Sequence, residues 1–109
     1  MPIQILNYEF LGPIRLSEWG PPMEKVVFLL FKRTKDTFAM IFADELEKTD
    51  DAGFFTKHEK FQCWIQNAGS EDNLYLSIYP MWDSSEDQRK KILQKIIASF
   101  RPLCNGEKN

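Results

Sequence analysis

The chain has few of the side chains that bind transition metals. It contains one histidine, His58, and two cysteines, Cys63 and Cys104. The cysteines are far apart in the sequence and form no CxxC pair, whereas a structural zinc site needs about four nitrogen or sulfur ligands. The sequence therefore predicts no metal site. It favours two reduced thiols, as in the cytoplasm, and leaves open a disulfide between them.

Long apolar segments are also lacking. The longest purely apolar run is VVFLLF at residues 26–31, whereas a helix that crosses a bilayer needs about 20 apolar residues. The first residues, MPIQILNYEFLG, include no basic residue and do not have the form of a signal peptide. We therefore expect a cytoplasmic protein that does not enter a membrane.

Neither sign of charge dominates the chain. With 14 basic and 16 acidic residues the net charge is −2, so no overall field attracts nucleic acid. Hydrophobic residues make up 43% of the sequence, which is enough to form the core of one domain. We divide the chain into an arm packed on the domain (residues 1–25), a single domain (26–105) and a tail (106–109).

The arm and the first half of the domain have different patterns. Glycine and proline interrupt residues 1–25, for which we expect at most one short edge strand. Val26–Lys32 and Thr37–Ala43 are apolar runs on either side of a polar turn, which predicts a β-hairpin. Residues 44–51 are mainly acidic and are interpreted as a solvated loop. In residues 53–65 the apolar side chains recur at helical spacing, and this predicts a helix with His58 on its inner side.

The second half of the domain predicts one strand and one helix. Residues 73–79, NLYLSIY, alternate between apolar and polar or aromatic side chains, as in a strand. The sequence SSEDQ at 84–88 has the form of a capping box, and the helix that it starts should end at Arg101. The expected fold is therefore α+β, sandwich-like, in the order arm-β-β-α-β-α. Its three-stranded, mainly antiparallel sheet is flanked by helices, because both faces of the hairpin strands are apolar.

Several short motifs, taken in order, resemble those of the GIY-YIG nuclease domain. Val26-Val27-Phe28 stands where the GIY motif would be, and Ile41-Phe42-Ala43 stands where YIG would be. His58 matches the histidine of an R-x-x-x-H motif on the following helix. The segment FRPLCN at 100–105 resembles the closing Y-x-P-x-x-N, with Asn105 as its asparagine.

The resemblance implies a domain that has lost its catalytic residues. Nucleases of this family use a glutamate-bound divalent ion, tyrosines and an arginine to cleave phosphodiesters. At the matching positions the chain has Phe28 and Ile41 for the tyrosines, Phe54 for the arginine and Leu93 for the glutamate. We therefore expect a degenerate GIY-YIG-like domain that is not an enzyme. It would act by binding nucleic acid or a protein partner, without a cofactor.

Two other functions stay open. In the first, the chain is a metal-dependent nuclease with Mg²⁺ or Mn²⁺, and a substitute such as Asp44, Glu45, Glu86 or Gln94 provides the carboxylate or amide. The catalytic remnants would then be His58, Asn105 and Glu86. In the second, the chain is a protein-interaction or structural module without a site, either a monomer or a homodimer.

Basic and aromatic side chains suggest where nucleic acid could bind. The basic residues of the last helix are expected to be solvated, and cations next to aromatic rings are typical of surfaces that bind single strands. The candidate binding residues are Lys57, Lys60, Trp64, Tyr75, Tyr79, Arg89 and Lys95. His58, which lies on an apolar stripe, is interpreted as an inherited residue used mainly for packing.

Overall fold

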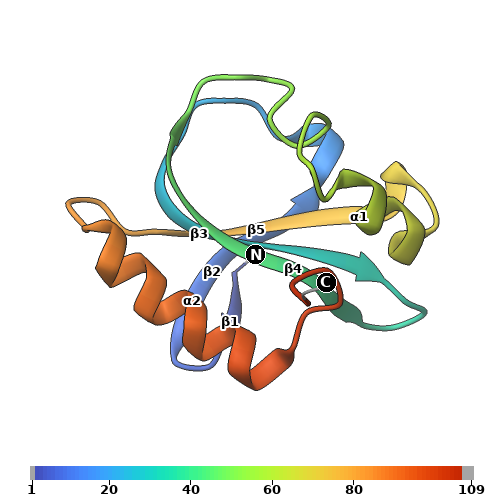
Figure 1. The fold of residues 1–109 in the computed structure, drawn as a ribbon. Coiled ribbons are helices and arrows are strands. Elements are labelled where there is room, and N and C mark those ends of the chain that lie inside the picture. The colour runs from blue at the N-terminus through green and yellow to red at the C-terminus, as the bar shows by residue number, and fades with distance from the viewer. Residues whose placement is uncertain (1, 107–109) are drawn as a thin grey trace.

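The computed structural model describes residues 2–106 as an α+β fold, with a five-stranded antiparallel sheet and two α-helices (Figure 1). The strands are β1 (Ile3–Ile5), β2 (Tyr8–Arg15), β3 (Met23–Arg33), β4 (Phe38–Thr49) and β5 (Leu74–Pro80). The helices are α1 (Phe61–Ala68) and α2 (Glu86–Phe100), and the short 3-10 turns are η1 (Leu16–Glu18) and η2 (Glu71–Asn73). The strand order is β1-β2-β5-β3-β4.

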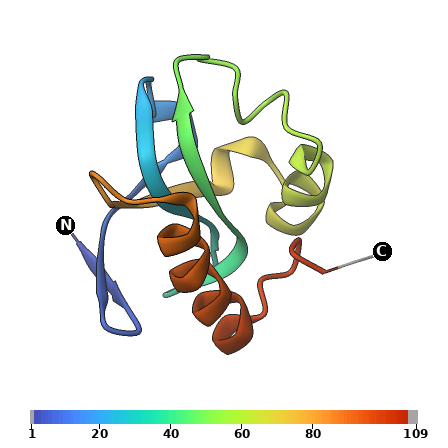
Figure 2. The same cartoon turned by 60° about the vertical axis from the view of Figure 1, so that its left-hand side comes forward.

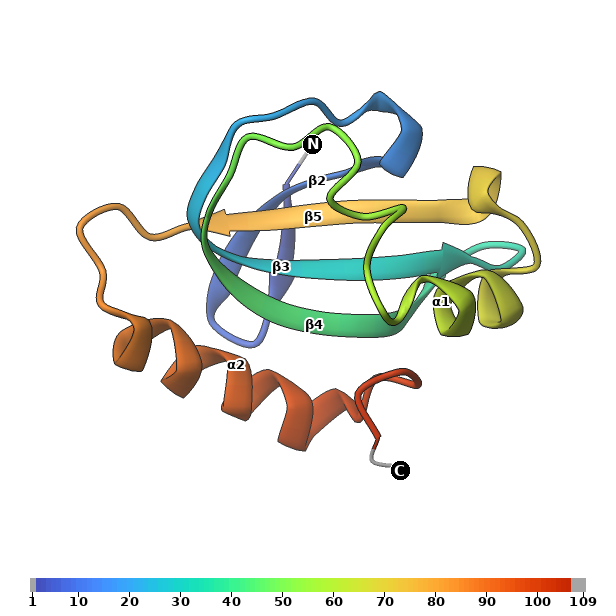
Figure 3. The same ribbon diagram turned by 45° about the horizontal axis from the view of Figure 1, so that its top comes forward.

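Strand β3 is buried on both faces, as its apolar sequence predicts. Successive side chains of a strand point to opposite faces of the sheet. Val26, Phe28 and Leu30 pack on the side of Trp64 from α1, whereas Val27, Leu29 and Phe31 pack on the side of Leu93 and Ile96 from α2. The two helices therefore cover opposite faces, and the expected order strand-strand-helix-strand-helix is present from β3 to α2 (Figure 3).

The sheet is wider than the three strands expected, because residues 3–15 form β1 and β2. Strand β2 pairs with β5 and contains a bulge between Leu11 and Ile14. Gly12 in this bulge has φ +95°, and a Cβ on it would lie 2.7 Å from the Leu76 carbonyl oxygen. Only glycine fits there easily. The Gly12-Pro13 pair that suggested an interruption is therefore a bulge within a strand.

The helix expected over residues 53–65 begins only at Phe61. Residues 52–60 form turns and a bend instead, and His58 lies among them. The imidazole Nδ1 of His58 accepts a hydrogen bond from the Lys60 backbone N–H at 3.0 Å. Such local bonds compete with helical backbone bonds. Turns also place Phe55 and His58 on the inner side, so the apolar spacing alone did not distinguish turns from a helix.

Residues 44–49 of the acidic stretch continue β4, so the predicted solvated loop is confined to the exposed Asp50 and Asp51. Within β4, Glu45 and Glu47 accept hydrogen bonds from the Arg89 guanidinium at 2.8 and 2.7 Å. Arg89, expected to be solvated, is only 1% exposed. Carboxylates on one side of the strand therefore have a buried partner on α2, and this pairing keeps the strand extended across a charged sequence.

The two cysteines form a disulfide. Cys63 on α1 is bonded to Cys104 in the segment that follows α2, with an S–S distance of 2.11 Å. This segment returns from the end of α2 toward α1 and β4 (Figure 2). Of the expected tail, residues 107–109 lie outside the described residues. No helix within residues 2–106 is both long and apolar enough to span a membrane.

Candidate functional site

A cavity of about 390 Å³ lies beside the edge strand β4. Its walls come from β4, from the turn before α1, from α2 and from the C-terminal segment. The lining residues include Asp44, His58, Glu59, Lys60, Leu93 and Asn105. Four separate parts of the chain therefore meet at one place.

The C-terminal segment lies along the edge of β4 and closes one side of the cavity. The Cys104 N–H donates to the Ile41 carbonyl at 2.7 Å. The side-chain amide of Asn105 then forms two bonds to Ala43: its Oδ1 accepts from the backbone N–H and its Nδ2 donates to the carbonyl, each at 2.8 Å. Asn105 thus pairs with β4 as a neighbouring strand would, and it satisfies backbone groups that an edge strand leaves open.

His58 is half-buried among aromatic rings. Its ring centroid lies 4.8 Å from that of Trp64 and 5.4 Å from that of Phe42. Burial disfavours the charged imidazolium and lowers the pKa of His58, although the negative charges of Asp44 and Glu59 partly oppose this effect. Because Nδ1 accepts the Lys60 N–H, the neutral ring has its proton on Nε2 and can donate there.

Asp44, on β4, provides a carboxylate to the same cavity. Burial raises the pKa of Asp44, while a hydrogen bond from the Glu45 backbone N–H, 2.8 Å from Oδ1, acts in the opposite direction. The cavity therefore combines an acceptor, the Asp44 carboxylate, with a donor, the neutral imidazole of His58. Glu59 adds a further negative charge and Lys60 a positive one.

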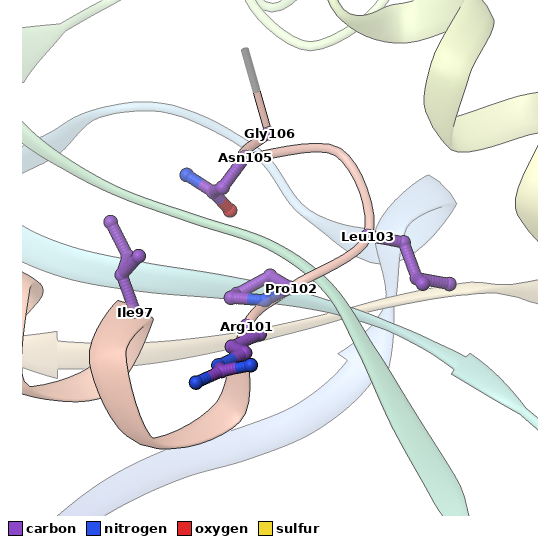
Figure 4. Close-up of a pocket in the computed structure, with 6 residues that line it drawn as sticks. All are labelled: Ile97, Arg101, Pro102, Leu103, Asn105 and Gly106. Carbon is purple, nitrogen blue, oxygen red and sulfur yellow. The ribbon is translucent and has the colours of Figure 1, made fainter. Parts of the chain in front are cut away.

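A second, more apolar cavity of about 390 Å³ adjoins the first (Figure 4). It lies where α2 passes into the C-terminal segment, and it shares Ile97, Asn105 and Gly106 with the first cavity. Its other lining residues are Arg101, Pro102 and Leu103. A ligand of the first cavity could thus extend along an apolar surface toward the Arg101 guanidinium.

The predicted catalytic remnants are only partly brought together. His58 and Asn105 line the same cavity, and Leu93 on α2 lines it too. Glu86 is not among the lining residues. It lies at the start of α2 and forms an ion pair with Lys90 at 2.6 Å. Asp44 was assigned to a loop. No signal in residues 44–48 places it beside the cavity, because the cavity is formed by segments that are far apart in the sequence.

The predicted binding residues do not form one patch. Trp64 is 0% exposed and Arg89 is buried, so neither presents a surface to a ligand. The other members are divided between the two faces of the sheet. Lys57 pairs with Asp51 near α1, Lys60 lines the cavity, Tyr79 packs on Phe10, Lys95 contacts the Tyr8 hydroxyl, and Tyr75 lies near the start of β5.

Across residues 2–106, no group of three or more His, Cys, Asp and Glu side chains is placed to hold a metal ion. Comparison of the chain with protein-family models, with curated proteins and with solved structures found no match.

Proposed function

We propose that the chain is a catalytically degenerate GIY-YIG-like domain that acts by binding, and that the cavity beside β4 is its former catalytic centre. One observation supports this proposal. His58, Leu93 and Asn105 match the histidine, glutamate and asparagine positions of the family, and all three line one cavity. They come from the turn before α1, from α2 and from the C-terminal segment, so the motif order alone did not require them to meet.

The residues in the cavity argue against hydrolysis. Leu93 stands at the position of the metal-binding carboxylate and is apolar and buried. Phe28 and Ile41, at the tyrosine positions, belong to the core. Arg89 cannot replace the lost arginine, because its guanidinium is bonded to Glu45 and Glu47. Groups that would bind an ion, activate water and stabilise a phosphorane are therefore replaced by packing residues.

The charge of the cavity favours a protein partner there. Asp44 and Glu59 outnumber Lys60 among its charged residues, so a phosphate group would meet net negative charge. A donor from a protein, such as a lysine ammonium or a side-chain amide, would pair with the Asp44 carboxylate. The His58 Nε2–H would be available to a neighbouring carbonyl oxygen.

A cleavage assay tests the loss of activity. Labelled single-stranded, duplex and branched DNA, and RNA, are incubated with the protein with and without Mg²⁺ or Mn²⁺, and binding and cleavage are followed in the same samples. We expect no cleavage under any condition. Metal-dependent cleavage by the wild-type protein that disappears in His58→Ala would overturn the proposal.

A gain-of-function variant tests the match of Leu93 to the glutamate position. Leu93→Glu would place a carboxylate in the cavity with Asp44 and His58, a ligand set that suits Mn²⁺. We expect calorimetry to detect Mn²⁺ binding to Leu93→Glu and no binding to the matched Leu93→Gln. If Leu93→Glu is folded by circular dichroism and binds no more Mn²⁺ than Leu93→Gln, the assignment is wrong.

The presence of Asp44 beside His58 favours a second candidate, a nuclease in which Asp44 replaces the lost carboxylate. This candidate predicts cleavage in the assay above that is lost in Asp44→Asn and kept in Glu86→Gln. Glu86 is the suitable control, because it is exposed and pairs with Lys90 outside the cavity.

A further inference from the structure

Three exposed side chains, those of Arg15, Arg33 and Phe38, and the partly buried Tyr75 form a surface at one end of the sheet, on the face that α2 covers elsewhere. Arg15 is on β2, Arg33 on β3, Phe38 on β4 and Tyr75 on β5. Arg15 is the register partner of Tyr75, and Arg33 is the partner of Phe38. Paired residues of antiparallel strands point to the same face. We call these four residues the sheet-end surface.

The aromatic rings of the sheet-end surface are held by their neighbours. The centroids of Phe38 and Tyr75 are 5.2 Å apart in an edge-to-face arrangement. Beneath them, buried Phe31 lies 6.0 Å from Phe38. Phe38 is nevertheless 37% exposed. Rings fixed by packing but open to solvent lose little conformational entropy when a planar ligand stacks on them.

The two guanidinium groups lie close to these rings. The Arg33 Cζ is 6.0 Å from the centroid of Phe38. Arg15 first, and then Arg33, lowers the pKa of the Tyr75 hydroxyl, in agreement with the register that places Arg15 opposite Tyr75. Tyr75 has the largest effect in raising the pKa of the Arg15 guanidinium, and the negative charges of Glu18 and Asp72 raise this pKa more weakly. Among the ion pairs found in residues 2–106, none includes Arg15 or Arg33.

We propose that the sheet-end surface binds single-stranded nucleic acid, with Arg15 and Arg33 contacting phosphates and Phe38 and Tyr75 stacking on bases. Guanidinium groups bind phosphate through two parallel hydrogen bonds, and aromatic rings on an open sheet are a recurring platform for unpaired bases. A duplex keeps its base faces stacked, so it could use only the arginines. The proposal goes beyond the function proposed above, because it concerns other residues and does not depend on the family assignment.

The small number of cations sets the expected affinity. Two phosphate contacts with a single strand predict a slope of about −1.4 for the logarithm of the binding constant against that of the salt concentration. The chain as a whole carries a net charge of −2 and adds no attraction. We therefore expect weak binding at low salt, and we expect the binding constant to fall with this slope as the salt concentration rises.

Fluorescence anisotropy with a labelled single-stranded 15-nucleotide oligo(dT), and with a duplex of the same length, tests the proposal. We expect the single strand to bind more tightly. Arg15→Gln/Arg33→Gln should weaken this binding about tenfold. Phe38→Leu, which removes the ring, should weaken it about as much, whereas Phe38→Trp should retain the affinity because it keeps an aromatic ring for stacking. Lys48→Gln/Lys91→Gln is the matched control, because it removes two exposed cations elsewhere and should change the affinity less than twofold.

Other results would overturn the proposal. One is the absence of oligonucleotide binding at low salt, and another is an equal loss of affinity in the double arginine and the double lysine variants. The others are equal affinity for the duplex and the single strand, and competition by poly-glutamate as strong as that by an oligonucleotide of the same charge. Poly-glutamate competition would identify a surface for acidic proteins. Circular dichroism confirms that each variant is folded. The cleavage assay and the Leu93 variants test the cavity through other residues, so failure of the proposed function and failure of this inference are distinguishable.

Discussion

His58 serves both packing and the cavity. Its ring contacts Phe42 and Trp64, which agrees with the packing interpretation, and it also lines the space beside Asp44. Because burial lowers the pKa of His58 in the folded chain, the unfolded chain takes up its proton first on acidification. This group therefore makes the folded state less stable as the pH falls from about 6.5 through the lowered pKa.

Replacing the Asp44 carboxylate should lower the pKa of His58 further. Asp44 is the main charge that raises this pKa against the effect of burial, so Asp44→Asn removes a favourable interaction with the imidazolium. As the chain has one histidine, its Cε1–H signal in an NMR titration reports the pKa directly. Glu86→Gln, outside the cavity, should leave the signal unchanged. A higher pKa of His58 in Asp44→Asn would contradict the electrostatic account.

Removing the Arg89 guanidinium should destabilise the fold strongly. Its side chain is 1% exposed and pairs with Glu45, which is itself largely buried. Arg89→Ala leaves that carboxylate without its partner, which lowers the free energy of unfolding by about 3 kcal/mol. Urea unfolding measures this change, with the exposed Lys91→Ala as control, for which a change within about 0.5 kcal/mol is expected. Similar unfolding midpoints for the two variants would show that the pairing contributes little.

Among the elements, β4 is the one whose environment is most unusual. It is the edge strand of the sheet, yet the C-terminal segment bonds to its backbone at Ile41 and Ala43. The bulge between Leu30 and Phe31 in the β3–β4 pairing lies beside these bonds. This part of the edge is therefore covered, and the same bonds place Asn105 at the cavity.

The amide of Asn105 should protect this part of β4. Asn105→Ala removes both bonds to Ala43, and we expect a loss of about 1–2 kcal/mol in stability because two backbone groups lose their partners. Native-state hydrogen exchange should show a faster Ala43 N–H. Asn105→Asp keeps the acceptor and loses the donor, so its Ala43 N–H should remain better protected than in Asn105→Ala. Unchanged exchange in Asn105→Ala would mean that the amide is not needed for protection.

At the scale of the whole molecule, the disulfide ties the C-terminal segment to the face of the sheet that α1 covers, because Cys104 packs in the core on that face. Cys63 lies on α1, whereas Cys104 follows the helix that covers the other face, and the two are 41 residues apart in sequence. The link holds the C-terminal segment against β4 and thereby completes one wall of both cavities.

Reduction of the disulfide should destabilise the folded chain. Closing a loop of this length restricts the unfolded chain and contributes about 4 kcal/mol to stability. Guanidinium unfolding of the wild type with and without a phosphine reductant measures the effect. The double variant Cys63→Ala/Cys104→Ala should resemble the reduced wild type and respond to no reductant. An unchanged midpoint after complete reduction, verified by thiol titration, would contradict this role.

Much of the fold could be predicted from local patterns. The β3–β4 hairpin, β5 and the capped helix α2 were expected from apolar runs, alternation and the SSEDQ box, and the capping box at Ser85 is present. These signals depend on residues close in sequence. The predictions failed where one local pattern fits two structures: residues 53–60 suit turns as well as a helix, and Gly12-Pro13 suits a bulge as well as a break.

The sequence by itself determined the β3–β4 hairpin, strand β5 and helix α2, and it placed His58, Leu93 and Asn105 in the order that suggested a family. Only the tertiary structure decided which side chains each of these residues contacts. Helical spacing puts Arg89 on the same stripe as Leu93 and Ile96, yet burial of a guanidinium depends on Glu45 and Glu47, more than 40 positions away. The disulfide, the cavity and the sheet-end surface likewise depend on contacts between distant segments, which local periodicity does not specify.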